Sequence, residues 1–245
     1  MRKNLLLIIV LLSFAFVFNS HGQDIPARDF YNKGIEESKK GNLDAAIAEY
    51  TNAIKLDSGF SQAYNSRALA YMRKRQFDLA ISDFSVAIAL KPESAGLYIN
   101  RSSTYNLKKE FDKSLADLER AIEIDPKFAE AYSARGQTYR QMKEFEKAVE
   151  NFSKAIEIKP YSTFYSGRCM AYFDLGKFEN AISDCSEGIN LNPKDINALY
   201  YRGLSRVKLE QNALAISDFR KVLDINANNI GAKTELEKLL KNTKY

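Results

Sequence analysis

The sequence predicts an all-α solenoid of six consecutive helix-turn-helix units, with one further helix at the C-terminal end. The main observation is a short pattern, Tyr followed three residues later by Arg, that recurs at spacings of 34, 34 and 33 residues. Its four copies begin at Tyr64, Tyr98, Tyr132 and Tyr165. A second observation is that apolar residues recur at helical spacing within the units, as at Ala148, Phe152 and Ala155. A fixed period of this length is typical of like units that bury their faces against one another.

Extending the period in both directions divides most of the chain into six units. Their boundaries are 27–60, 61–94, 95–128, 129–161, 162–195 and 196–229. The first helix of each unit carries a small residue at the eighth place, namely Gly34, Ala68, Ser102, Gly136, Cys169 and Gly203. The second helix carries a small residue where the two helices are expected to cross most closely, namely Ala46, Ala80, Ser114, Ala148, Ala181 and Ala215. Four second helices are expected to end before a proline, which lacks an N–H and clashes with the preceding turn, namely Pro92, Pro126, Pro160 and Pro193.

The first 22 residues have the pattern of a secretory signal peptide. Arg2 and Lys3 precede an apolar stretch, 5–18, that is shorter than the roughly 20 residues of a membrane-spanning helix. Ser20 and Gly22 are small residues that predict cleavage after Gly22, which leaves a short segment, 23–26, before the repeats. We therefore expect a secreted or periplasmic protein with no integral membrane segment after cleavage. An uncleaved membrane anchor is the alternative.

The charges and the missing residue types narrow the function. The 36 Lys and Arg residues are interspersed with 31 Asp and Glu residues, so we expect no nucleic-acid partner. The only histidine, His21, lies in the predicted signal peptide. A mature chain without His has no Ser-His-Asp or Cys-His nucleophile and no histidine zinc site. Since the sequence also shows no phosphate-binding loop and no dinucleotide fingerprint, we expect neither catalysis nor a cofactor nor a bound metal.

The seventh place of every unit is basic. The six residues are Lys33, Arg67, Arg101, Arg135, Arg168 and Arg202. Sixteen residues after each of them, on the second helix, stand Glu49, Asp83, Asp117, Asn151, Asp184 and Asp218. Opposite charges at a fixed offset predict structural ion pairs, for which the planar guanidinium is well suited, rather than a stripe of ligand-binding cations. Each arginine could meet the acid of its own unit or that of the preceding unit.

These positions together resemble the tetratricopeptide repeat family, which has small residues at places eight and twenty, aromatic residues at places four, eleven and twenty-four, and Pro at place thirty-two. The resemblance covers Ala27 to Asn229. Departures are concentrated in the first and last units, namely Glu37, Ser58, Arg206 and Ala227. The segment 230–245, which contains Leu236, Leu239 and Leu240, is similar to the cap helix and tail of such arrays. The resemblance implies a right-handed solenoid.

The resemblance also implies a partner-binding concave surface lined by the first helices. Its polar part would consist of Arg28, Tyr31, Asn65, Arg73, Asn100, Asn106 and Arg140. Its apolar part would consist of Met170, Phe173, Tyr200, Leu204 and Val207, with Tyr201 at the edge. Exposed apolar clusters usually mark contact sites. The alternative is that the cap helix folds over part of this apolar lining.

Two cysteines occupy facing places of the fifth unit. Cys169 stands at the small eighth place and Cys185 at the aromatic twenty-fourth place, which a helical hairpin sets opposite each other. An oxidising compartment favours a disulfide, whereas two buried free thiols remain the alternative.

The expected function is that of a non-catalytic scaffold or adaptor for a protein or an extended peptide. A self-assembling structural component of the cell envelope is the alternative, and an enzyme is a remote one. The sequence predicts no oligomeric state.

Overall fold

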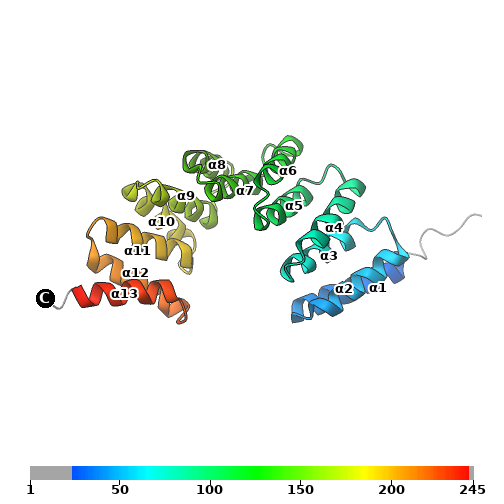
Figure 1. The fold of residues 1–245 in the computed structure, drawn as a ribbon, viewed down its shortest axis with the longest axis horizontal. Coiled ribbons are helices and arrows are strands. Elements are labelled where there is room, and N and C mark those ends of the chain that lie inside the picture. Colours follow the sequence, from blue (N-terminus) through cyan, green and yellow to red (C-terminus); the bar gives the residue numbers. More distant parts are fainter. Residues whose placement is uncertain (1–23, 243–245) are drawn as a thin grey trace, which may run out of the picture. The chain divides into compact units, whose positions relative to one another are not determined.

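The computed structural model describes residues 24–242, and this part of the chain contains thirteen α-helices and no strand (Figure 1). The first helices of the six hairpins are α1 (Asp24–Lys40), α3 (Ser61–Arg73), α5 (Ala95–Leu107), α7 (Ala129–Gln141), α9 (Ser162–Asp174) and α11 (Ile196–Lys208). The second helices are α2 (Leu43–Leu56), α4 (Phe77–Leu90), α6 (Phe111–Ile124), α8 (Phe145–Ile158), α10 (Phe178–Leu191) and α12 (Asn212–Ile225). The last helix is α13 (Ile230–Asn242). The predicted all-α array of hairpins is confirmed, whereas the predicted signal peptide and its cleavage site lie outside the described residues.

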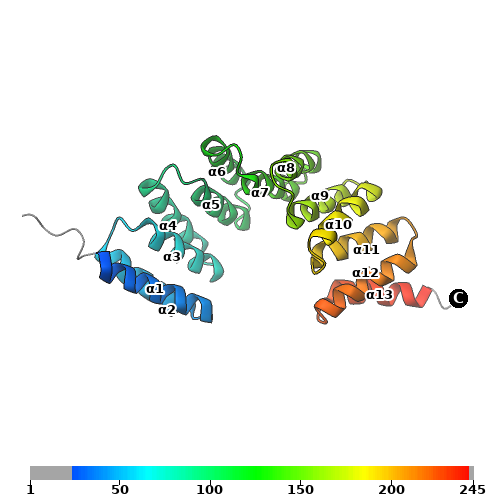
Figure 2. The same ribbon diagram turned by 180° about the vertical axis from the view of Figure 1, so that it is seen from behind.

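The helices form two compact units, each larger than one repeat. From here on, the first unit is the one with α1–α4, which ends at Pro92, and the second unit is the one with α5–α13, which starts at Glu93. Figure 2 shows the succession of hairpins within each of them. In the second unit, first helices contact the first helices of neighbouring hairpins, since α7 touches both α5 and α9, and α9 touches α11. Second helices make no comparable contact with one another within residues 93–242. Because a stack curves toward the side where its members lie closest, the first helices form the concave layer of the second unit.

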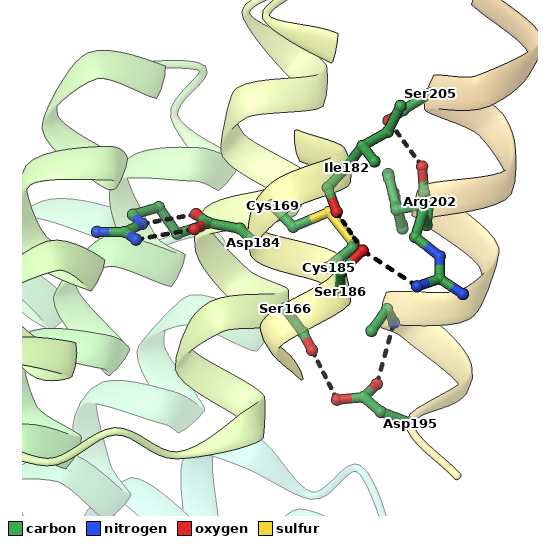
Figure 3. The surroundings of a disulfide bond; sticks show 12 residues. Ser166, Cys169, Ile182, Asp184, Cys185, Ser186, Asp195, Arg202 and Ser205 are labelled. Carbon is green, nitrogen blue, oxygen red and sulfur yellow. Dashed lines mark hydrogen bonds and ion pairs between the residues drawn. A yellow bond between two sulfur atoms is a disulfide. The ribbon is translucent and has the colours of Figure 1, made fainter. Parts of the chain in front are cut away.

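Each hairpin packs a small residue of the first helix against a large residue of the second. A Cβ atom added to Gly34, Gly136 or Gly203 would lie only 2.5, 3.1 or 2.7 Å from an aromatic carbon of the facing helix. The large residues of five second helices are buried, namely Tyr50, Phe84, Leu118, Phe152 and Phe219. In the fifth hairpin, a disulfide between Cys169 and Cys185 fills both places, with the Cα atoms 5.4 Å apart (Figure 3). The cross-link therefore stands where four of the other hairpins have an aromatic ring and the third has Leu118.

The turn inside each hairpin contains one residue with a left-handed backbone. The six residues, with φ between 59° and 87°, are Gly41, Arg75, Lys109, Lys143, Gly176 and Glu210. A residue in this conformation ends a helix and reverses the chain, but it strains any residue that carries a Cβ atom. Four of the six turns thus hold a residue whose conformation the surrounding packing imposes.

One aspartate fixes α11 on α9. Asp195 precedes α11, and its Oδ1 accepts a hydrogen bond from the backbone N–H of Ala198 over 3.1 Å. Its Oδ2 accepts from the hydroxyl of Ser166 of α9 over 2.6 Å (Figure 3). The same oxygen accepts from the hydroxyl of Ser162 of α9 over 2.7 Å. The N-cap of one first helix therefore also binds the neighbouring first helix, which fixes the spacing between them.

The helix α13 closes the C-terminal end of the second unit. Ala232 and Leu239 of α13 are buried in one cluster with Leu199, Phe219 and Val222 of the last hairpin. The helix thus shields the apolar face that a further hairpin would otherwise cover. No helix in residues 24–242 is both long and apolar enough to span a membrane.

Candidate functional site

Most of the basic residues at the seventh place of the six hairpins form ion pairs. Four arginines pair with the aspartate sixteen residues later in their own hairpin, which decides between the two pairings left open by the sequence. The pairs are Arg67–Asp83, Arg101–Asp117, Arg168–Asp184 and Arg202–Asp218. In each pair, Nε and Nη2 donate to the two carboxylate oxygens over 2.6–3.1 Å. This is the planar bidentate geometry that makes arginine–carboxylate pairs strong.

Tyrosine rings lie beside three of these arginines, and three of them are also bonded to the preceding hairpin. The guanidinium carbon of Arg168 lies 5.8 and 5.9 Å from the ring centroids of Tyr165 and Tyr172. Its Nη1 donates to Ser153 Oγ of the preceding second helix over 2.9 Å. The same link to the preceding second helix is made by Arg67 and Arg202. Hydrogen bonding to the aspartate raises the pKa of Arg168. Because Nε, Nη1 and Nη2 are all engaged, these arginines join hairpins and are not available to a ligand.

Two of the six residues at the seventh place depart from this pattern. Lys33 is exposed, and its Nζ lies 5.5 Å from the ring centroid of Phe30. The expected pair with Glu49 does not form, and the buried Oε2 of Glu49 has no hydrogen-bond partner in the part of the chain that is described. An ammonium group lacks the planar fork with which the arginines hold their carboxylates, and within residues 24–242 no second helix precedes this hairpin. Arg135 faces Asn151 instead of an aspartate and donates to it only through Nε.

In the first unit, Tyr31 is drawn into the packing of its own hairpin. Its ring centroid lies 5.8 Å from that of Tyr50 and 4.9 Å from that of Phe60. The hydroxyl of Tyr31 lies 3.4 Å from Ser66 Oγ of α3. Asn65 is half-buried on α3. Tyr31 therefore contributes to packing in addition to any contact with a partner.

The two arginines predicted for the groove of the first unit are exposed. Nη1 of Arg73 donates to the backbone oxygen and the hydroxyl of Ser38, both at 3.3 Å. Arg28 lines a pocket of about 240 Å³ together with Asp57, Gly59, Phe60, Gln62 and Lys91. Arg73 is thus bonded to the neighbouring helix α1, whereas Arg28 lines a separate surface pocket.

In the second unit, three predicted residues meet on the concave layer, namely Arg140 of α7, Phe173 of α9 and Tyr201 of α11. Nε of Arg140 donates to Asp174 Oδ2 over 2.6 Å, and Nη2 donates to the Tyr201 hydroxyl over 3.2 Å. The same guanidinium lies over the Tyr201 ring at 5.6 Å, and the Phe173 ring meets that ring edge to face at 5.4 Å. We call these four residues the Arg140 cluster. It ties three successive first helices together.

The Arg140 cluster is mostly but not completely withdrawn from water. The side chains of Arg140 and Asp174 keep 18% and 22% of their exposure. Their opposite charges cancel, so the cluster presents aromatic edges and a tyrosine hydroxyl rather than a free cation. Phe173 also packs at 5.6 Å against the ring of Phe178, which makes it part of the fifth hairpin as well as of the surface.

Three other residues of the predicted apolar lining are partly buried at the C-terminal end of the second unit. Tyr200, Leu204 and Val207 pack against the cluster that contains the buried residues of α13. The Tyr200 hydroxyl would lie 2.7 Å from a Cβ atom added to Gly231 of α13, and its ring lies 5.9 Å from that of Phe219. Burial raises the pKa of Tyr200. The packing of Tyr200 against α13 favours the alternative in which the cap helix folds over part of the apolar lining.

Asn106 is also drawn into the interior. Its Nδ2 donates to Thr138 Oγ1 over 2.8 Å, and that oxygen lies 3.3 Å from Ser114 Oγ. Oδ1 of Asn106 is buried without a hydrogen-bond partner among residues 24–242. The last two predicted residues, Asn100 and Met170, are half-buried on α5 and α9.

The member of the Arg140 cluster that the sequence analysis missed is Asp174. It follows Arg140 by 34 residues, which is one repeat period, and both residues lie near the ends of neighbouring first helices. Opposite charges one period apart could therefore have revealed the pair. Among the described residues, no group of three or more His, Cys, Asp or Glu side chains could hold a metal ion.

Profiles of the tetratricopeptide repeat match the chain in four places and together cover more than half of it. Three described as tetratricopeptide repeat match residues 31–95, 129–162 and 169–195, and one described as TPR repeat matches residues 103–143. No curated protein matches the sequence.

Solved structures confirm the fold. A chain of the APC/C hetero-tetramer Cut9–Hcn1 has a TM-score of 0.77 and 19% identity, and the match covers 90% of this chain and 44% of that one. PilF of Pseudomonas aeruginosa has a TM-score of 0.73 and 15% identity, over 90% of this chain and 99% of that one. The MamA protein has a TM-score of 0.57 and 26% identity, over 69% of this chain and 93% of that one. These chains are similar to this protein in fold.

Proposed function

The chain belongs to the tetratricopeptide repeat family, and we propose that it is a non-catalytic scaffold that binds a protein or an extended peptide on its concave layer. Proteins with this fold generally mediate protein–protein or peptide binding, and the family is typically non-catalytic. The observation that carries the proposal is the Arg140 cluster, which offers aromatic edges and a hydroxyl on the concave side of the second unit. Aromatic residues of this kind dominate the energetics of many interfaces.

Polar side chains on the same first helices as the Arg140 cluster support an extended ligand. Gln141 and Thr163 are exposed on α7 and α9, and Gln137 is half-buried on α7. Amide and hydroxyl groups can donate to and accept from the backbone of an extended peptide, which supplies one donor and one acceptor per residue. A neutral polar layer around an aromatic centre is the usual composition of such interfaces.

We place the mature protein in the periplasm or outside the cell. The apolar stretch 5–18 behind Arg2 and Lys3 supports export, and cleavage after Gly22 would start the mature chain at Gln23. The buried disulfide in the fifth hairpin supports an oxidising compartment, since structural disulfides are rare in the cytosol. N-terminal sequencing of native protein should find Gln23, and recovery of Met1 in a membrane pellet would contradict this assignment.

Site-specific photo-crosslinking tests the binding surface. A photo-reactive amino acid at Gln141, exposed on the first helix α7, should cross-link a partner in the cells that make the protein. The matched control is the same amino acid at Glu146, exposed on the second helix α8 of the same hairpin. A partner adduct from position 141 that is absent from position 146 supports the concave layer. Adducts from position 146 alone would place the binding surface on the opposite layer and contradict the proposal.

A further inference from the structure

Arg135 occupies the same place as four paired arginines but lacks their carboxylate. Nε of Arg135 donates to Asn151 Oδ1 over 2.6 Å. The Asn151 amide nitrogen turns away from the guanidinium and donates to the backbone oxygen of Lys147 over 2.8 Å. Where the four hairpins with an arginine–aspartate pair present a second carboxylate oxygen to Nη2, the fourth hairpin presents none. Half of the bidentate contact is therefore missing, and with it the compensating negative charge.

The second link made by the other arginines is missing as well. Arg168 and Arg202 use Nη1 to reach a serine hydroxyl of the preceding second helix, over 2.9 and 3.1 Å. The residue at the corresponding place before Arg135 is Glu119, which is exposed on α6. Within residues 24–242, no hydrogen bond or ion pair reaches Nη1 or Nη2 of Arg135. Two terminal nitrogens with four N–H donors are thus unused.

The guanidinium of Arg135 lines an open pocket of about 380 Å³ between α7 and α8. The pocket is lined by Tyr132, Arg135, Glu150, Asn151, Ser153, Lys154 and Glu157. The Tyr132 ring centroid lies 5.5 Å from the guanidinium carbon of Arg135, so this ring covers one face of the guanidinium plane. Lys154 is paired with Glu157 at 2.9 Å, so these two charges cancel each other. Glu150 is exposed and makes no ion pair with Arg135 among the described residues.

We propose that this pocket is a carboxylate-binding site in which Arg135 receives from a ligand the group that Asp supplies in four other hairpins. The four arginine–aspartate pairs show that this place of the fold holds a carboxylate against a guanidinium at 2.6–3.1 Å. In the fourth hairpin Arg135 lines the pocket, and the fork formed by its unused Nη1 and Nη2 fits the two oxygens of a carboxylate. The ligand is a free carboxylic acid or the side chain of an acidic residue on a partner. The site is separate from the concave layer and does not depend on the proposed function.

A titration with acetate tests the site directly. Sodium acetate replaces sodium chloride at constant ionic strength, and the Nε–H resonances of the arginines are followed by ¹H–¹⁵N NMR. The Arg135 resonance, assigned from its absence in Arg135→Lys, should shift and saturate. Asn151→Asp copies the four hairpins that have an arginine–aspartate pair, so this variant should bind acetate about tenfold more weakly or not at all. Equal, saturable binding in wild type and Asn151→Asp would overturn the proposal, and so would a non-saturating shift shared by all arginines.

Thermal unfolding gives a second readout that does not depend on the NMR assignment. Acetate should raise the melting temperature of the wild type but not that of Asn151→Asp. Arg135→Lys keeps the charge but loses the fork, so a rise as large as in the wild type would show a general salt effect and overturn the proposal. N-acetylglutamate amide then separates the two ligand sources. Tighter binding than acetate supports an acidic side chain of a partner, whereas equal binding supports a free acid.

Discussion

Replacing the disulfide by the small and large residues that face each other in another hairpin tests how much the cross-link stabilises the α9–α10 hairpin. The double variant Cys169→Gly/Cys185→Phe copies the fourth hairpin, in which Gly136 faces the buried ring of Phe152. The disulfide closes a loop with a sequence separation of 16 residues. Chain entropy assigns such a loop about 3 kcal/mol. Reduction of the wild-type disulfide should therefore increase the opening of the α9–α10 hairpin by about 100-fold.

The Gly/Phe variant should recover part of this loss. A fully buried Phe side chain contributes about 1.5–3 kcal/mol by leaving water. The matched control, Cys169→Ala/Cys185→Ala, has neither the cross-link nor the ring and should be the least stable of the three proteins. The expected order of hairpin stability is thus oxidised wild type, then Gly/Phe, then Ala/Ala. Only the wild type should respond to a reductant.

Native-state hydrogen exchange resolves this order, because a repeat array opens locally and a single global unfolding free energy would average over its hairpins. Amide protection of α9 and α10 is compared with that of α5 and α6, with and without reductant. The loss of protection should be confined to α9, α10 and their direct neighbours. If reduction leaves the protection of α9 and α10 unchanged in the wild type, the cross-link adds nothing to the packing and the entropy argument is wrong.

Three further predictions concern single residues. Lys143→Gly should raise the free energy of opening the α7–α8 hairpin by about 1 kcal/mol, because φ is 64° there, whereas Lys147→Gly inside α8 should lower it by about 1 kcal/mol, both measured by native-state hydrogen exchange. Arg168→Ala should cost about 3 kcal/mol by leaving the buried Asp184 unpaired, and a variant as stable as wild type would exclude a structural role. Burial raises the pKa of Tyr200, so the stability that its protonated side chain gives to the folded state is complete below a pH of about 10 and is lost as the pH rises through the folded pKa. In Tyr200→Phe the melting temperature should therefore fall less at alkaline pH than in the wild type. An unchanged pH profile would contradict this assignment.

The helical hairpins could be predicted from the sequence because the period repeats the same packing constraint. A small residue must face each large one, as at Gly203 and Phe219, and one residue per turn must reverse the chain. These constraints are local to one hairpin, so they are visible in one stretch of sequence. The pairing of each arginine needed the structure, because an aspartate of the same hairpin and one of the preceding hairpin lie at similar sequence distances.

The candidate site was less predictable because it depends on contacts between hairpins. Places in the repeat identified Arg140, Phe173 and Tyr201 as surface residues, but the pairing with Asp174 follows from the spacing of neighbouring first helices. The position of Tyr200 depends on α13, whose sequence lies outside the repeat. A place in the repeat therefore predicts which layer a residue belongs to, and the neighbouring helix decides whether the residue stays accessible.

The charge balance of the two candidate sites indicates how each should respond to salt. Arg140 is already paired with Asp174, so a partner gains little from attraction to this guanidinium. It gains more by covering the rings of Phe173 and Tyr201, at about 25 cal/mol per Å² of apolar surface. Arg135 has no paired carboxylate, so binding there rests on attraction between opposite charges in a pocket open to solvent. Binding to the concave layer should therefore change little with ionic strength, whereas binding at Arg135 should weaken steadily as salt is added, because screening acts on the charged contact and not on the apolar one.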